Sequence, residues 1–176
     1  MERPTDSPAQ MTAGDTNTGV TPTYKVREIR PGDAEAYRSI LERTTEEDRY
    51  CRFFHAVDHF DEAEIQRFVD PGQDTLGFIA EDAEHALGVA HAMRIGPDRA
   101  ELAIVVAGDA RHVGVGTALF AHLLNALPNA GFRRLVAYAL VSNPAFPRLA
   151  LQAGMVPHKP CDGIVTWTLT LDGPVV

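Results

Sequence analysis

A glycine-containing stretch, RHVGVGTALF (residues 111–120), is the part of this 176-residue chain best suited to binding an anion. Gly114 and Gly116 directly precede an apolar run with helical spacing. The first turn of a helix offers N–H groups without intrahelical partners, and the helix dipole adds partial positive charge there. Glycines remove the side chains that would hold a phosphate away from those groups. The stretch therefore predicts a phosphate-binding turn, although an ordinary tight turn before a helix has the same appearance.

The spacing of this turn differs from two widespread phosphate-binding motifs. The P-loop ends in a Lys-Ser/Thr pair, which does not follow these glycines. The dinucleotide fingerprint has three glycines and follows the first strand of its domain. The turn matches neither motif, so its assignment depends on the segments around it.

Those segments predict one α/β domain built on a single mixed sheet, because helix and strand patterns interleave along the chain. Upstream of the turn we expect a short strand within 24–30, helices over 33–44, 45–54 and 61–70, and strands over 75–80, 86–95 and 100–107. Downstream we expect a helix to Leu127, a strand over 133–140, a short helix within 143–154 and a strand over 163–171. Asp33 is placed to cap the first helix.

Composition sets broad limits on the class of protein. Residues 1–23 are rich in Pro, Thr, Gly and Asp, so we expect a disordered tail followed by one domain over 24–176. The formal charge of −8 argues against a nucleic-acid partner. No apolar run approaches the roughly 20 residues that a membrane helix needs. Cys51, Cys161 and the histidines have no metal-ligand spacing, and we expect a reduced, cytoplasmic setting without bound metal.

The glycine turn resembles a motif of the GNAT superfamily of acyl-CoA-dependent N-acyltransferases. RHVGVG has the Arg/Gln-x-x-Gly-x-Gly pattern, and it lies between an apolar strand and a Leu-rich helix, as in that family. Asn143 and the pair Gly154-Met155 resemble the family's Asn-…-Gly-Phe signature. The resemblance extends over 26–171. It implies a twisted mixed sheet, flanked by helices, that splays between its fourth and fifth strands.

Two stretches resemble one branch of this superfamily more closely. IRPGDAEAYRSI with RYCRFF is similar to the start of the bacterial protein lysine acetyltransferases that act on acyl-CoA synthetases. GVAHAMRIGPDRAELAIVV resembles their third and fourth strands, with Glu101 at the position of an acidic residue. This closer resemblance implies a protein lysine as the acceptor.

The resemblance also implies how acetyl-CoA would bind. In the family the diphosphate lies on the amides of the glycine turn, here residues 112–117, and the pantetheine arm pairs with the main chain of the fourth strand. The implied cofactor-binding residues are Ile104, Val105, Val106, Arg111, His112, Val113, Gly114, Val115, Gly116, Thr117 and Asn143. Arg111 would add charge near the phosphates or be an ordinary solvated arginine. Asn143, which precedes Pro144, would hydrogen-bond the pantetheine arm, act as the N-cap of the helix that follows, or do both.

Glu101 is the candidate general base. A lysine amine has a reference pKa of about 10.4, so a proton acceptor is needed before it can attack a thioester at neutral pH. Position within the family pattern favours this role, while a glutamate at a strand start paired with Arg94 or Arg99 is the alternative. The backbone N–H of Val106 or a neighbour is the implied donor to the developing oxyanion.

One position departs from the family pattern. Many GNAT enzymes have a tyrosine in the helix after the asparagine, where it protonates the departing thiolate, and that position is Ala150 here. Tyr138, in the preceding strand, is expected to be packed. The thiolate would then leave unassisted or take its proton from water. The protein lysine acetyltransferases also tend to have a small residue at this position, which agrees with the closer resemblance.

Together these features predict an acetyl-CoA-dependent N-acetyltransferase acting on a primary amine. The favoured acceptor is a protein lysine, with an acyl-CoA synthetase as the target. The alternatives are a GNAT enzyme acting on a small amine and a non-catalytic GNAT fold that binds acyl-CoA as a sensor.

Overall fold

The computed structural model describes residues 24–57, 60–70, 72 and 74–171. The segment 1–23, for which the sequence predicts a disordered tail, lies outside these residues, as does 172–176. Within the described ranges, no helix is both long and apolar enough to cross a membrane.

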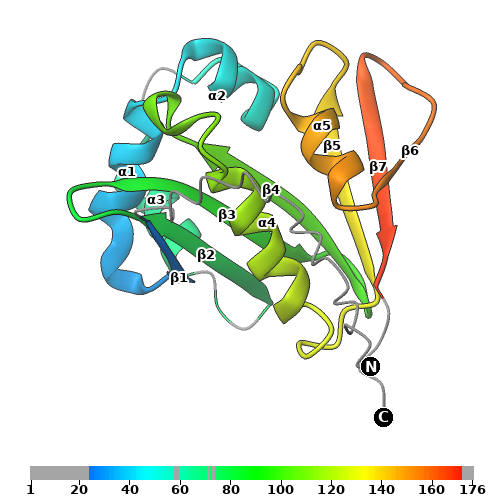
Figure 1. Cartoon of the computed structure of the whole chain (residues 1–176), viewed down its shortest axis with the longest axis horizontal. Helices are drawn as coiled ribbons and strands as arrows, with labels where there is room; N and C mark the ends of the chain where they lie inside the picture. Colours follow the sequence, from blue (N-terminus) through cyan, green and yellow to red (C-terminus); the bar gives the residue numbers. More distant parts are fainter. Residues whose placement is uncertain (1–23, 58–59, 71, 73, 172–176) are drawn as a thin grey trace, which may run out of the picture.

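The strands within these ranges form one mixed sheet in the order β1-β2-β3-β4-β5-β7-β6 (Figure 1). They are β1 (Lys25–Glu28), β2 (Thr75–Glu81), β3 (Ala86–Arg94), β4 (Arg99–Val106), β5 (Arg134–Leu140), β6 (Val156–Pro157) and β7 (Ile164–Thr170). β4 and β5 are parallel, and the other neighbours are antiparallel. The predicted mixed sheet is confirmed. The two-residue β6 was not predicted, because two residues carry no periodic pattern.

The helices cover both faces of this sheet. They are α1 (Ala34–Glu42), α2 (Glu46–Phe53), α3 (Glu62–Val69), α4 (Val115–Ala126) and α5 (Phe146–Gln152), with 3-10 turns η1 (Pro31–Asp33) and η2 (Gly108–Ala110). Figure 1 shows α4 in front of the sheet and α3 behind it. α4 packs on β2, β3 and β4, α1 packs on β3 and β4, and α2 contacts β4 and β5.

Apolar stripes hold these layers together, as their spacing predicts. Tyr37, Ile40 and Leu41 of α1 are completely buried. Leu119 and Leu123 are buried on the sheet side of α4. Because burial of each such side chain contributes about 1.5–3 kcal/mol, these contacts fix α1 and α4 on opposite faces of the same strands.

The sheet opens between β4 and β5. The parallel pairing of these strands extends only from Arg99↔Arg134 to Leu102↔Ala137, although β4 continues to Val106 and β5 to Leu140. In Figure 1 the two strands lie together at the lower right and diverge toward the top. The splay implied by the family resemblance is therefore present, and it leaves the last residues of β4 without a strand partner on that side.

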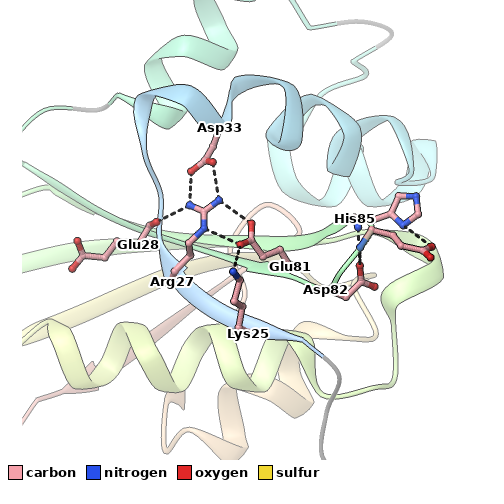
Figure 2. A network of polar contacts seen from close by, with 8 residues as sticks. Lys25, Arg27, Glu28, Asp33, Glu81, Asp82 and His85 are labelled. Atoms are coloured by element: carbon pink, nitrogen blue, oxygen red, sulfur yellow. Dashed lines mark hydrogen bonds and ion pairs between the residues drawn. The ribbon is translucent and has the colours of Figure 1, made fainter.

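An ion-pair network fixes β1 and the turn after it against β2 (Figure 2). The Arg27 guanidinium donates to both carboxylate oxygens of Asp33 at 2.8 Å and to Glu81 at 2.8 and 3.1 Å. These bonds lower the pKa of both carboxyl groups. Asp33 precedes α1 as predicted but does not cap it with its side chain. Its carboxylate binds Arg27 and the Arg30 N–H instead, because charge-assisted bidentate bonds are stronger than a bond to a neutral amide.

Candidate functional site

The glycine turn lies between β4 and α4, where the sequence predicts it. α4 begins at Val115, and its N-cap is Gly114, with a φ of 87°. A residue with a Cβ is disfavoured in this left-handed conformation, which explains the need for glycine. His112 also has a positive φ, 63°. Residues 111–114 are exposed.

The N–H groups of this turn are available to a ligand. No backbone N–H of residues 111–117 donates a hydrogen bond to any residue that the structure describes, and the first bonded amide is that of Ala118, to the Gly114 carbonyl at 2.9 Å. A Cβ added at Gly116 would lie 3.6 Å from Val106 Cγ2, in the space beside the turn. Successive free N–H groups at the positive end of a helix fit the diphosphate of coenzyme A.

Arg111 contacts a residue from a distant helix. Its guanidinium forms an ion pair with Oδ1 of Asp48 on α2, while Oδ2 of the same carboxylate accepts hydrogen bonds from the Thr45 N–H and hydroxyl. Arg111 is therefore neither simply solvated nor directed only at a ligand. It links the glycine turn to the helix that packs beside the splay.

Arg43, at the end of α1, holds the segment before the glycine turn. Its carbonyl accepts from the Gly108 N–H at 2.9 Å, and its side chain donates to Asp109 and to the Ala86 carbonyl. A Cβ at Gly108 would lie 2.9 Å from the Arg43 carbonyl oxygen, so this approach requires glycine. Arg43 could not be identified from the sequence, because its partners are mostly backbone groups far away in the chain.

The last residues of β4 direct alternate backbone groups into the splay. The Ala107 N–H donates to the Leu87 carbonyl at 2.9 Å. Hydrogen-bonded and non-bonded residue pairs alternate along an antiparallel ladder. The backbone groups of Val105, two residues earlier, are therefore also bonded to β3. Ile104 and Val106 then direct their N–H and C=O groups away from β3, beyond the last β4–β5 pair. These two residues can pair with an amide-containing arm, whereas the backbone of Val105, also predicted to bind it, is directed the other way.

Glu101 lies on the opposite face of the sheet from α4. The Val106 side chain faces Gly116 of α4, and strand side chains alternate, so Glu101 projects from the face that carries α1 and α3. Glu101 is half-buried and pairs in register with Met93 and Val136. It makes no ion pair within the described residues, and Arg94 bonds Asp74 instead. A carboxylate here can accept a proton from a group approaching that face.

Asn143 caps the chain segment that leads into α5. Its Oδ1 accepts from the N–H groups of Ala145 and Phe146 at 3.0 and 3.1 Å. The N-cap residue of α5 is Ala145, so Asn143 stabilises the turn before the helix and does not take the N-cap position weighed from the sequence. The Asn143 Nδ2 group makes no hydrogen bond within the described residues, so a second bond to a ligand is compatible with this turn.

The tyrosine nearest in sequence to the missing acid position is exposed. Tyr138 is 42% exposed, so the expectation that it is packed was wrong. Ala137 and Ala139 are buried, and because strand side chains alternate, Tyr138 projects from the opposite face. Ala150, at the family's tyrosine position, is completely buried.

A separate hollow of about 300 Å³ lies beside α2, lined by Glu46, Glu47, Tyr50, Ala56 and Val57. None of the predicted site residues lines it. Among the described residues, no group of three or more His, Cys, Asp or Glu side chains is arranged to hold a metal ion.

The fold and the site geometry define a class of protein: a mixed sheet whose parallel strands separate beside a helix start with free backbone amides. The chain belongs to the acetyltransferase (GNAT) family, whose model matches residues 35–155. It is 25% identical over 143 residues to an acetyltransferase of Pseudomonas aeruginosa, with 78% of this chain and 77% of that protein covered.

Solved structures support the same class. The GNAT domain of PAT from S. lividans is 27% identical, with a TM-score of 0.79 over 84% of this chain and 90% of that one. A GNAT superfamily phosphinothricin acetyltransferase from Sinorhizobium meliloti, solved with acetyl-CoA, has 19% identity and a TM-score of 0.72, with 88% and 92% of the two chains covered. The second similarity concerns the fold alone.

Proposed function

We propose that the protein transfers the acetyl group of acetyl-CoA to a primary amine. The observation that carries this proposal is the combination of free amides at residues 111–117 with the unpaired edge of β4 at Ile104 and Val106. The first group suits a diphosphate and the second suits an amide-containing arm. The related phosphinothricin acetyltransferase was solved with acetyl-CoA, which is consistent with this ligand.

Each residue has a distinct part in the proposed binding. The amides of residues 112–117 would hold the diphosphate, with charge added by Arg111. The backbone groups of Ile104 and Val106 would orient the arm, and the spare amide of Asn143 would bond it. Bound acetyl-CoA supplies a thioester whose carbonyl carbon accepts the amine. The chain's own groups fix where that carbon lies.

Glu101 would then act as the general base. Because it projects from the face opposite α4, it can meet an amine that approaches from the α1 and α3 side. Glu101 would take the amine's proton, directly or through water, and the Val106 N–H would donate to the oxygen that gains negative charge. The amine nitrogen bonds the carbonyl carbon, the C–S bond then breaks, and coenzyme A leaves as a thiolate, either unassisted or taking its proton from water.

A protein lysine is our proposed acceptor, with an acyl-CoA synthetase as the target. The support is the resemblance of IRPGDAEAYRSI, RYCRFF and the β3–β4 region to the bacterial protein lysine acetyltransferases. The second candidate is a small amine; phosphinothricin acetyltransferase, which shares this fold, is named for a small-molecule substrate. Both candidates use the same chemistry at the transferred carbon.

The Glu101→Gln variant tests the base. We expect kcat to fall roughly 10²- to 10⁴-fold, the usual contribution of general-base catalysis, while acetyl-CoA binding measured by calorimetry stays within about twofold. Glu84→Gln is the matched control, because Glu84 is exposed in the β2–β3 hairpin. An unchanged rate and pH profile in Glu101→Gln would remove Glu101 from the mechanism. Failure of the unmutated protein to bind acetyl-CoA would remove the whole proposal.

The acceptor is tested by incubating the protein with labelled acetyl-CoA and two panels, purified acyl-CoA synthetases and small amines. Mass spectrometry of each product locates the acetyl group. Acetylation of a synthetase lysine that depends on Glu101 supports the protein acceptor, and turnover confined to the small amines rejects it.

A further inference from the structure

The first described residue of the chain lies against the glycine turn. A Cβ built on Gly114 would lie 3.4 Å from the hydroxyl oxygen of Tyr24. The two residues are far apart in the sequence, and no local pattern joins them. The Tyr24 hydroxyl is thus within contact distance of the turn that we propose as the diphosphate-binding site.

The Tyr24 ring is held in place by both packing and the strand that follows it. The ring is half-buried and packs against the hydrophobic core. β1 begins at the next residue, where Lys25 pairs in register with Glu81 and forms an ion pair with it at 3.1 Å. Arg27 adds its bonds to Glu81 and Asp33, as Figure 2 shows. This network fixes the start of β1 and so positions Tyr24.

The hydroxyl has the chemistry that a phosphate oxygen requires. A phenol O–H donates one hydrogen bond and carries no charge. A tyrosine hydroxyl, with an ordinary pKa of about 10, keeps its proton at neutral pH, and burial raises the pKa of Tyr24 further. Within the described ranges the Tyr24 hydroxyl makes no hydrogen bond. The neighbouring backbone amides of residues 111–117 donate none there either. A neutral donor therefore lies next to a row of free backbone donors.

We propose that Tyr24 is a cofactor-positioning residue whose hydroxyl donates a hydrogen bond to a phosphate oxygen of acetyl-CoA at the glycine turn. This inference rests on the proposed function, because it names a further donor in the same site. It also gives the ion-pair network of Arg27, Asp33 and Glu81 a role in cofactor binding, since the network holds the strand that carries Tyr24.

The test compares Tyr24→Phe with the unmutated protein by calorimetry. Removing the hydroxyl keeps the packed ring, so we expect the Kd for acetyl-CoA to rise about 10- to 100-fold, the effect of losing one hydrogen bond to a charged group. Binding of acetyl-pantetheine, which lacks the diphosphate, should not change. Tyr50→Phe, at a 49% exposed tyrosine on α2, is the matched control and should leave both affinities unchanged.

A second measurement uses the unmutated protein and does not depend on the variant folding. With ¹³Cζ-labelled tyrosine, the chain's four tyrosines give four resonances, and the one absent from Tyr24→Phe is Tyr24. Were that variant not to fold, exclusion with Phe variants of Tyr37, Tyr50 and Tyr138 assigns it instead. The Tyr24 resonance should shift with coenzyme A and not with acetyl-pantetheine.

The outcomes separate the two proposals. An unchanged acetyl-CoA affinity in Tyr24→Phe, an equal loss for acetyl-pantetheine, or a Tyr24 resonance that coenzyme A does not move would overturn the role of Tyr24 alone. Absence of acetyl-CoA binding in the unmutated protein would overturn the proposed function and this inference together.

Discussion

At the scale of single residues, Arg111 illustrates how a motif residue acquires a partner that the motif does not specify. Its position in the Arg-x-x-Gly-x-Gly pattern suggested a contribution to phosphate binding. The ion pair with Asp48 of α2 means that a diphosphate at this turn would compete with a carboxylate for the same guanidinium. Asp48 would therefore weaken the binding of a diphosphate at this turn.

Neutralising Asp48 should strengthen cofactor binding. We expect Asp48→Asn to lower the Kd for acetyl-CoA about two- to fivefold, the range given by a partly exposed ion pair of up to about 1 kcal/mol. The amide oxygen of Asn can still accept hydrogen bonds from the Thr45 N–H and hydroxyl, so the start of α2 should keep its cap. Calorimetric titration measures the change.

A double-mutant comparison separates the local effect from general charge. In an Arg111→Ala background, Asp48→Asn should have no effect, because the guanidinium for which the two anions compete is gone. Asp109→Asn, which neutralises a carboxylate paired with Arg43, controls for the change in net charge. Equal tightening by Asp48→Asn and Asp109→Asn would contradict the competition.

At the scale of elements, the start of α4 combines two glycines with different tasks. Gly114 has a φ of 87°, whereas Gly116 lies within the regular helix. A Cβ at Gly116 would make only ordinary contacts, 3.6 Å to Val106 Cγ2 and 3.8 Å to Leu149 Cδ2. Backbone conformation therefore requires the first glycine, whereas the second would leave space for the diphosphate that we propose to bind here.

Alanine variants should separate these tasks. Gly114→Ala should lower the free energy of unfolding by about 1–2 kcal/mol, the cost of a left-handed non-glycine residue. Gly116→Ala should leave that free energy unchanged or raise it by up to about 1 kcal/mol, the helix preference of Ala over Gly, while acetyl-CoA affinity falls about tenfold or more. Urea unfolding and calorimetry give the two quantities.

Gly131→Ala is the control for the conformational cost, since Gly131 has a φ of 83° and a Cβ added there would meet no atom within 4 Å. It should lose stability as Gly114→Ala does and keep its acetyl-CoA affinity. If Gly116→Ala bound acetyl-CoA as tightly as the unmutated protein, the glycine turn would not be the diphosphate-binding site.

At the scale of the whole molecule, stability should depend on pH through a buried histidine. His91 on β3 is 3% exposed, and its Nε2 bonds the Phe68 carbonyl at 3.0 Å. Its ring packs against the rings of Tyr37 and Phe68, which stack on each other. Burial, with a smaller effect of the nearby Arg52 charge, lowers the pKa of His91 from 6.5 to about 4. The folded protein therefore holds this ring neutral.

The sign of the effect follows from which state binds the proton. Below pH 6.5 the unfolded chain takes up a proton at His91 and the folded protein does not, so stability falls as pH decreases from about 6.5 to about 4. The loss from this group between pH 7 and pH 5 should be roughly 2 kcal/mol. Urea unfolding of His91→Gln, which does not titrate, should show a pH dependence smaller by that amount. Parallel pH profiles for both proteins would contradict the assignment.

Much of the fold could be predicted from local patterns. The apolar stripe of α1, the start of α4 at the glycine turn and the strands β2, β3, β4, β5 and β7 follow from spacing that each segment carries within itself. The separation of β4 from β5 was expected only through the family resemblance, because no local pattern distinguishes a paired strand end from an unpaired one.

The candidate site, like the fold, could be predicted only in part from the sequence. The backbone features of the turn were predictable, since glycines and a following helix determine where N–H groups are free. The side-chain partners were not: Asp48 beside Arg111, Arg43 beneath Gly108 and the exposure of Tyr138 depend on how elements distant in sequence meet. Asp33 is a further example: local sequence favoured it as the cap of α1, but its carboxylate binds the Arg27 guanidinium instead.

The order of helices and strands, the family motif and the glycine turn can all be read along the chain, because backbone conformation and apolar periodicity are properties of short segments. Three features follow from the folded arrangement alone: which backbone groups of β4 stay unpaired, on which face Glu101 projects, and the contact of Tyr24 with Gly114. They depend on the register of the sheet and on contacts between segments far apart in the chain, and no short segment contains that information.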